Sequence, residues 1–355
     1  MPDSLKHHFL LDPDVVFLNH GSFGACPRPV FETYQRWQCE LEQQPVAFLG
    51  RRAETLLAEA RAGLADYVGA AAGDVVYFPN PTTAINAVAR SLRLAPGDEI
   101  LSSDHEYGAM DRTWRFVCRQ TGASYVRRPI PLPVTTHQEF VETFWAGVTA
   151  ATRVIFLGHI TSPTALTFPV AEICRRARAA GLLTIIDGAH APGQVPLNLR
   201  ELGADIYTGA CHKWLCGPKG AAFLYARPEV QGWLEPLVVS WGWESERPSG
   251  ARFVDWHEWQ GTRDIAAFLA APAAIAFQAE HDWDTVRRRC RVLASQTRDR
   301  IAPSPACRAS VRTRPSGSRS SSQPPCPTWT PTSSSAGCTT STGSRCRYFA
   351  GMARH

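Results

Sequence analysis

The stretch from Leu182 to Leu224 limits the fold of this chain more than any other part of its sequence. It reads LLTIIDGAHAPGQVPLNLRELGADIYTGACHKWLCGPKGAAFL. The first apolar run, Leu182 to Ile186, has the length of a buried strand in a parallel sheet, and a second such run covers Ala204 to Thr208. Strand-like and helical segments alternate at similar spacing elsewhere in the chain. This pattern predicts an α/β fold with a mostly parallel central sheet.

Each of these two strands is followed by residues suited to catalysis. Asp187-Gly188-Ala189-His190 ends the first strand, and Cys211-His212-Lys213-Trp214 follows the second. Open α/β sheets bind ligands outside the carboxyl ends of their strands. A carboxylate and an amine there suit pyridoxal phosphate, because the Lys amine forms a Schiff base and the carboxylate keeps the pyridine nitrogen protonated. From spacing alone, a solvated loop residue at 213 and a helix N-cap at 187 are an equally good interpretation.

Lysine is rare in this chain, which makes its position informative. Among 37 lysines and arginines, the lysines are Lys6, Lys213 and Lys219. Arginine stays protonated and makes no imine. A lysine kept at position 213 therefore indicates chemistry that arginine cannot perform.

The motifs DGAHAPGQ and TGACHKWLCGPKG resemble the active-site signature of class V, fold-type I pyridoxal-phosphate enzymes, and within that family the isopenicillin N epimerase-like proteins. The supporting blocks, in the expected order, are LNHGSFGACP (18–27), NPTTAINAVARSL (80–92), DHEYGAMDRTW (104–114), GHITSPTALTFPV (158–170) and EWQGTRDIAAFLA (258–270). The resemblance implies three catalytic residues: Lys213 holds the cofactor, Asp187 pairs with the ring nitrogen, and His190 approaches the phenolic oxygen. It also implies that His212 reaches the cofactor phosphate.

Further cofactor contacts are expected where other strands end. Asn80-Pro81-Thr82-Thr83 follows the predicted strand 75–78 and begins a helix, an arrangement that suits a phosphate but is also common for ordinary capping. The resemblance implies that Thr82 and Thr83 bind the cofactor phosphate.

Two more strand ends complete the predicted cofactor site. After the strand 99–103, the alignment with the family places Tyr107 over the pyridine ring, with His105 as the competing candidate. After the strand 153–158, the resemblance implies that Thr161 or Ser162 donates to the phenolic oxygen.

The remaining candidates lie at the two ends of the resembling region. Asn19 and His20, which directly precede Gly21, are implied substrate contacts. Thr262 is implied to reach the phosphate of a partner subunit, which makes a homodimer part of the site. Arg263 has two equally weighted interpretations, binding a substrate carboxylate or pairing with Asp264. The eleven cysteines show no zinc-like CxxC pairing, so we predict no metal site.

Charge and composition exclude several classes of function. The formal charge is +5, but residues 302–355 hold seven arginines and no acid, and without them 30 cations face 32 acids. A nucleic-acid partner therefore lacks its electrostatic basis. No apolar run approaches the ~20 residues that span a bilayer, and the N-terminus lacks a signal-peptide pattern, so we expect no membrane association and a cytoplasmic location.

The chain divides by composition into four segments. We expect an N-terminal arm (1–28), a cofactor-binding large domain (29–275), the helical start of a C-terminal small domain (276–301) and a tail (302–355). The tail is dominated by Ser, Pro, Thr, Arg and Cys, a composition that cannot bury enough apolar surface to order itself. The hypothesis is that a frameshift replaced the small domain of the family.

The resemblance implies a reaction at the α-carbon of an amino acid or an amino-acid-containing peptide, with epimerisation as the first expectation. Aminotransferase and cysteine desulfurase or C–S lyase chemistry use the same residues and remain alternatives. Epimerisation needs a second proton donor, for which Tyr107 and His20 are only candidates. An alternative of another class is an inactive remnant that still binds the cofactor.

Overall fold

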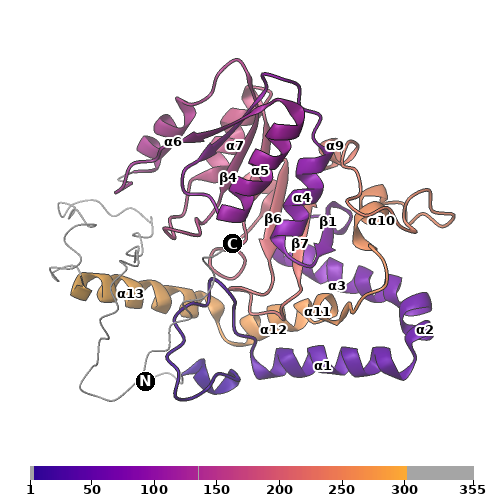
Figure 1. Cartoon of the computed structure of the whole chain (residues 1–355). Coiled ribbons are helices and arrows are strands. Elements are labelled where there is room, and N and C mark those ends of the chain that lie inside the picture. Colours follow the sequence, from indigo (N-terminus) through magenta and orange to yellow (C-terminus); the bar gives the residue numbers. More distant parts are fainter. Residues whose placement is uncertain (1–3, 135, 302–355) are drawn as a thin grey trace, which may run out of the picture.

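The computed structural model describes residues 4–134 and 136–301. A seven-stranded sheet forms its centre (Figure 1). The strands are β1 (Val75–Phe78), β2 (Glu99–Ser103), β3 (Ser124–Arg128), β4 (Thr152–Gly158), β5 (Leu183–Asp187), β6 (Ile206–Ala210) and β7 (Ala222–Ala226). Their order in the sheet is β1-β7-β6-β5-β4-β2-β3. β7 runs antiparallel to both β1 and β6, and the other neighbours are parallel. The predicted α/β fold with a mostly parallel sheet is confirmed.

Helices connect the strands and cover the sheet. The α-helices of the described residues are α1 (Arg28–Gln43), α2 (Pro45–Ala47), α3 (Ala53–Val68), α4 (Pro81–Ser91), α5 (Gly108–Thr121), α6 (His137–Trp145), α7 (Val170–Ala179), α8 (Leu199–Leu202), α9 (Pro228–Gln231), α10 (Arg252–Glu258), α11 (Ala266–Leu269), α12 (Ala271–Glu280) and α13 (Trp283–Ile301). Three short helical segments are η1 (Leu5–His8), η2 (Phe48–Arg52) and η3 (Ala72–Asp74).

Two hydrophobic cores lie on opposite faces of the sheet, because successive side chains of a strand point to opposite sides. Ile185 of β5 packs into the core that includes α4 and α5, whereas Ile186 packs into the core that includes α1, α3 and α7. Asp187, two residues after Ile185, therefore points to the side of α4 and α5. The alternation of β5 thus decides on which face the acid emerges.

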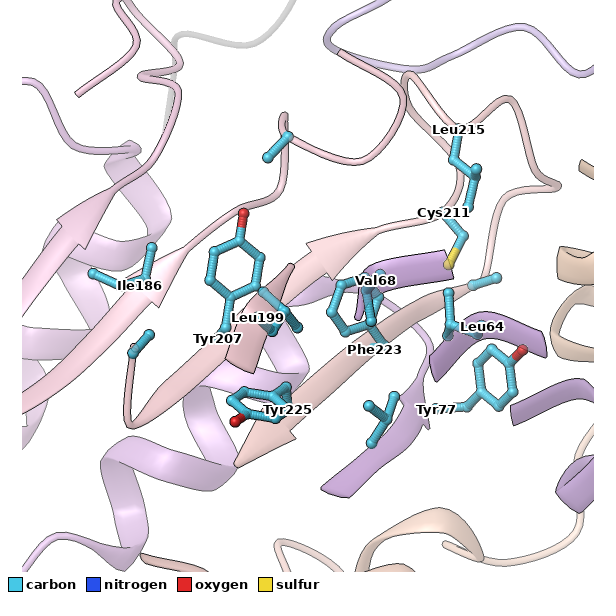
Figure 2. Packing of buried hydrophobic residues seen from close by; sticks show 14 of the residues in the cluster. Leu64, Val68, Tyr77, Ile186, Leu199, Tyr207, Cys211, Leu215, Phe223 and Tyr225 are labelled. Atoms are coloured by element: carbon cyan, nitrogen blue, oxygen red, sulfur yellow. The ribbon is translucent and has the colours of Figure 1, made fainter. Parts of the chain in front are cut away.

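Several aromatic side chains pack in the core that includes α1, α3 and α7 (Figure 2). Tyr207 and Phe223, on the neighbouring strands β6 and β7, stack with their ring planes 14° apart. A Cβ atom on Gly188 would lie 2.1 Å from the ring of Tyr207. The turn after Asp187 can therefore follow its path only because residue 188 is glycine.

The strand predicted at 204–208 begins two residues later, at Ile206. Asp205 has another role: its carboxylate accepts hydrogen bonds from the backbone N–H and hydroxyl of Thr184 (2.7 and 3.0 Å) and pairs with Arg227. These bonds hold the start of β6 next to β5. The apolar pattern showed the strand, but these long-range contacts set where it begins.

The helices of the described residues include none long and apolar enough to cross a membrane. The predicted boundary between residues 275 and 276 lies inside α12, so the division into large and small domain stays a prediction. The predictions for the tail at 302–355 lie outside the described residues.

Candidate active site

The ends of five strands meet at one edge of the sheet. Gly158 of β4 pairs with Asp187, and Asp187 pairs with Thr208 of β6. On the other side, Ala210 at the end of β6 lies opposite Ala222, which pairs with Phe78 at the end of β1. The segments that follow these strands carry most of the residues predicted from the sequence. Their proximity follows from the register of the sheet.

Lys213 lies in the connection between β6 and β7, and contacts from distant segments hold its backbone. Its carbonyl accepts hydrogen bonds from Cys216 N–H and from Nε2 of His20, each at 3.0 Å. The next carbonyl, that of Trp214, accepts one from Nε2 of Gln278 on α12 at 2.9 Å. The N-terminal arm and α12 thus fix the loop from both sides.

Two glycines let other backbone segments approach this loop closely. A Cβ on Gly24 would lie 2.4 Å from the carbonyl oxygen of His212 and 2.5 Å from that of Lys213. A Cβ on Gly193, where φ is +85°, would lie 2.1 Å from the carbonyl oxygen of Trp214. Only glycine fits these positions without displacing the loop.

The amine of Lys213 faces His190. Its Nζ lies 3.0 Å from Nε2 of His190, and Nδ1 of the same ring lies 3.3 Å from Nε1 of Trp214. Burial lowers the pKa of Lys213, against the opposing effect of Asp187. Burial, followed by the nearby Lys213 and His212, lowers the pKa of His190 to about 3. The imidazole is therefore neutral at physiological pH, and the lysine is a more reactive amine than one in water.

Asp187 is buried at the end of β5, with 8% of its surface exposed. Its Oδ1 accepts a hydrogen bond from Ala189 N–H at 2.9 Å, and this is the carboxylate's one hydrogen bond within the described part of the chain. Burial raises its pKa, while the Ala189 N–H and Lys213 act in the opposite direction. A buried carboxylate with spare acceptor capacity suits a ligand that brings its own N–H and positive charge.

The predicted phosphate-binding residues lie at the start of α4 and beside Lys213. Asn80 caps α4, since its Oδ1 accepts from the N–H and hydroxyl of Thr83 at 2.8 and 3.1 Å. Thr82 lies on the first turn with a partly exposed side chain. His212 donates through Nδ1 to the carbonyl of Ala221 at 3.2 Å, which leaves Nε2 for a ligand, and burial lowers its pKa. Thr82 and Thr83 follow β1 and His212 follows β6, the two strands on either side of β7.

Tyr107 and His105 differ in the burial and the hydrogen bonding of their side chains. His105 is buried, with Nδ1 2.8 Å from the hydroxyl of Thr164 and Nε2 2.9 Å from the carbonyl of Ile130. Tyr107 is 49% exposed at the start of α5. Of the two predicted rings, that of Tyr107 is the more accessible, and its contact with the cofactor stays a prediction.

Thr161 and Ser162 differ in the same way. The buried Thr161 hydroxyl is 2.7 Å from that of Thr164 and accepts from Leu166 N–H at 2.9 Å, whereas Ser162 is exposed. Both follow β4, as predicted, but only Ser162 presents its side chain to solvent.

Among the described contacts, Thr262, Arg263 and Asn19 make none with Lys213 or His190. Thr262 and Arg263 line a separate pocket of about 440 Å³ with residues of α1. Arg263 donates to the carbonyl of Glu258 at 2.8 Å and lies over the ring of Phe268, so its described contacts do not include Asp264. Asn19 is exposed and caps a turn through Ser22 N–H. His20 contacts the carbonyl of Lys213, as described above.

Several residues of the site were not predicted from the sequence. Trp214 and Gln278 contact the Lys213 loop, and Glu106 lies against Gly158, where an added Cβ would be 3.1 Å from its Oε2. The backbone N–H of His159 donates to the carbonyl of Asp187 at 2.8 Å, and Nδ1 of the His159 ring lies 2.9 Å from the hydroxyl oxygen of Tyr207. Gln278 gave no local signal, since it is far from Lys213 in the sequence. Its hydrogen bond to the backbone carbonyl of Trp214 becomes visible only in the folded structure.

The chemistry of this donor set fits a phosphorylated aldehyde on a basic aromatic ring. One edge of the sheet carries the Lys213 amine of lowered pKa, the buried Asp187 carboxylate and the N-terminus of α4, which is rich in hydroxyls. Among the described residues, that carboxylate has one hydrogen bond.

Comparison with known proteins supports a site for this kind of cofactor. The profile of the family "Aminotransferase class-V" matches residues 26–322. The chain belongs to the class V aminotransferase family. Its cofactor is pyridoxal phosphate, and the fold-type I architecture expected from the sequence is confirmed.

Relatives of this class V chain have more than one activity. The isopenicillin N epimerase of Streptomyces clavuligerus is 39% identical over 313 residues, 85% of this chain and 79% of that protein. A putative L-cysteine desulfhydrase of Oryza sativa subsp. japonica is 32% identical over 289 residues, 77% of this chain and 58% of that protein. A solved C-DES mutant with glycine covalently linked to its pyridoxal phosphate is 23% identical, with a TM-score of 0.71 over 82% of this chain and 79% of that chain.

Proposed function

We propose that this chain acts at the α-carbon of an amino acid, or of an amino-acid-containing peptide, and that it epimerises that carbon. The observation that carries the proposal is the Lys213 Nζ, held 3.0 Å from His190 and electrostatically coupled to Asp187 at the edge of the sheet. The likeness to isopenicillin N epimerase, at 39% identity over most of both chains, favours epimerisation over other reactions of the family.

Each residue of the proposed site has one task toward the cofactor. Pyridoxal phosphate, when bound, withdraws electrons from the α-carbon of an amino acid attached to it. Lys213 supplies the amine that binds the aldehyde, and Asp187 holds the proton on the ring nitrogen. His190, with Ser162 or Thr161, donates toward the phenolic oxygen. Thr82, Thr83 and His212 bind the phosphate, and Tyr107 packs on the ring. These tasks are assigned from the strand-end geometry together with the family resemblance.

Proton transfer at the α-carbon falls to Lys213 on one face, because burial lowers its pKa and so favours the neutral amine, which can act as a base. Tyr107 is the candidate for the opposite face, since its side chain is half exposed. His20 is less suited, because its Nε2 is bonded to the carbonyl of Lys213. Asn19 and Arg263 remain proposed substrate contacts, and Thr262 a proposed contact to the phosphate of a partner subunit in a homodimer.

The second candidate function is C–S bond cleavage of cysteine. It is favoured by the 32% identity to a putative L-cysteine desulfhydrase, of which this chain covers 58%. Both reactions begin with loss of the α-proton to the same base. Product analysis separates them: epimerisation gives the D-amino acid centre, and C–S cleavage gives sulfide. A protein that binds the cofactor and gives no product from any amino acid would be the inactive remnant.

The first test is where the cofactor attaches. We expect borohydride treatment of the full chain with pyridoxal phosphate to fix the cofactor on the peptide that contains Lys213, as read by mass spectrometry. Lys213→Ala should abolish this label, and Lys219→Ala should retain it, because Lys219 is exposed six residues further along the same loop. A label on Lys6 or Lys219, or none, would refute the assignment.

A further inference from the structure

The indole of Trp214 can only donate, and not accept, in its hydrogen bond with His190. Its indole Nε1 lies 3.3 Å from Nδ1 of His190. An indole nitrogen carries one hydrogen and accepts none, so Trp214 donates and Nδ1 of His190 accepts. A neutral imidazole has one N–H, which must then be on Nε2. Trp214 thus selects the tautomer of His190.

The selected tautomer determines the state of the lysine. Nε2 of His190 is 3.0 Å from Nζ of Lys213, so its N–H is directed at the amine. An ammonium group has three donors and no lone pair, and two donors cannot share a hydrogen bond. The contact is therefore a hydrogen bond only when Lys213 is unprotonated.

Packing around Trp214 keeps the indole in this orientation. A Cβ added to Gly21 of the arm would lie 3.2 Å from the indole ring and 3.4 Å from Cε1 of His190, so the arm covers both rings. The ring of His20 lies 5.2 Å from that of Trp214, and Gln278 holds the Trp214 carbonyl. The donor cannot turn away from His190 without displacing the arm.

We propose that Trp214 is a positioning residue, which fixes His190 as a donor through Nε2 and thereby keeps the amine of Lys213 unprotonated and ready to attack an aldehyde. This inference rests on the proposed function of Lys213. It assigns the reactivity of the lysine to a residue that does not contact the lysine amine.

Charged neighbours act on the same amine and must be considered together. Asp187, on β5, favours the protonated form of Lys213, and burial opposes it. The titratable groups that face His190 are Lys213 and His212, and each of them, when protonated, disfavours an imidazolium. Lys219 acts on His20 and His212. The Trp214–His190 hydrogen bond adds to burial and resists the pull of Asp187.

The tautomer can be measured without activity. In the cofactor-free full chain with ¹⁵N-labelled histidine, NMR correlation of ring nitrogens with ring C–H protons shows which nitrogen carries the proton. The signals of His190 are those lost in His190→Asn. We expect Nε2–H in the wild type and a population with Nδ1–H in Trp214→Phe.

Trp283→Phe is the matched control. Trp283 donates its indole N–H to the carbonyl of Gly193 at 2.9 Å, in the turn after His190, and makes no described contact with His190. It should leave the tautomer unchanged. Nδ1–H in the wild type, or an unchanged tautomer in Trp214→Phe, would overturn the inference. The wild-type spectrum decides even if the variant does not fold.

The second readout is the pH dependence of acylation at Lys213, followed by mass spectrometry of its peptide. In Trp214→Phe, His190 is free to accept from an ammonium, so the midpoint should rise by up to about one pH unit, which lowers the rate near neutral pH by up to about tenfold. Trp283→Phe should keep the wild-type midpoint. An unchanged midpoint in Trp214→Phe contradicts the inference.

The two proposals fail in different ways. If the tautomer and midpoint respond as expected but pyridoxal phosphate attaches to no lysine, the proposed function fails and the role of Trp214 stands. If the cofactor attaches at Lys213 and Trp214→Phe changes neither measurement, the role of Trp214 fails alone.

Discussion

Glu106 shows how burial changes the charge of a single side chain beside the site. Its Oε1 accepts a hydrogen bond from the hydroxyl of Ser103 at 2.5 Å, and burial raises its pKa to about 8. Nearby Asp187 and Asp111 also raise the pKa, while Ser103 and the backbone of Gly158 act against them. At neutral pH the group is therefore mostly protonated. Asp187 then has an uncharged neighbour, which helps it remain an anion.

Replacing Glu106 by Gln should change how stability depends on pH. The pKa of this carboxyl is near the ordinary value of 4.5 in the unfolded chain and about 8 in the folded one. Between these values the folded state binds more protons, so the stabilising contribution is present below pH 4.5 and is lost as the pH rises toward 8. The loss amounts to roughly 1.4 kcal/mol for each pH unit crossed. Glu106→Gln should remove this fall.

Urea unfolding at several pH values between these limits measures the effect. Glu54→Gln is the control, because Glu54 is exposed on α3 and should keep the wild-type slope. Equal slopes for the wild type and Glu106→Gln would show that Glu106 is ionised in the folded protein.

The sequence could predict the residues of the site that follow strands, and not those that act through a contact from afar. Asp187, His190 and Lys213 follow apolar runs, so their meeting at one edge is a consequence of parallel strands. Trp214 is adjacent to Lys213, but nothing in the sequence distinguishes a packing indole from a donor to His190. Gln278 reaches the loop from α12, and no local pattern encodes that approach.

At the scale of elements, the connection between β6 and β7 is held by the N-terminal arm. The arm contributes the hydrogen bond from His20 and the close passage of Gly24 over the backbone of His212 and Lys213. The sequence predicts only a substrate role for this segment, through Asn19 and His20. The structure shows that the arm also supports the lysine.

Gly24→Ala should weaken cofactor binding, although Gly24 is not itself a proposed cofactor ligand. The new methyl group would meet backbone oxygens at 2.4 and 2.5 Å, which cannot move without shifting the loop. We expect a loss of about 1–3 kcal/mol of stability, the usual cost of overpacking, and a loss of cofactor affinity of about tenfold. Denaturant unfolding and fluorescence titration with pyridoxal phosphate measure the two effects.

Gly50→Ala is the matched control, since a Cβ at Gly50 meets nothing within 4 Å. Wild-type affinity in both variants would show that the arm does not position the loop.

At the scale of the whole molecule, large apolar side chains are exposed on the arm and after β7. Leu18 is 86% exposed, Phe23 73% and Trp241 86%. A homodimer whose partner contributes Thr262 would cover such side chains, because burying apolar area is the main favourable term in stable association. This links the proposed partner contact to a surface of the described chain.

We therefore expect the full chain to sediment as a dimer and Trp241→Ser or Leu18→Ser to shift it toward the monomer. Val292→Ser is the control, because Val292 is exposed on α13, away from the arm and the segment after β7 in sequence. Equilibrium sedimentation over a range of concentrations measures the change. A monomeric wild type would contradict the proposed shared site.

The pairing of β1 has a consequence for how this protein is made. β1 lies at the edge of the sheet, and its neighbour there is β7, with Val75 opposite Tyr225. While the ribosome is still translating the codons between them, the apolar segment Val75–Phe78 has no strand to join and remains a hazard for aggregation. The nascent polypeptide must keep this segment covered, by its own helices or by a chaperone, until β7 has left the exit tunnel.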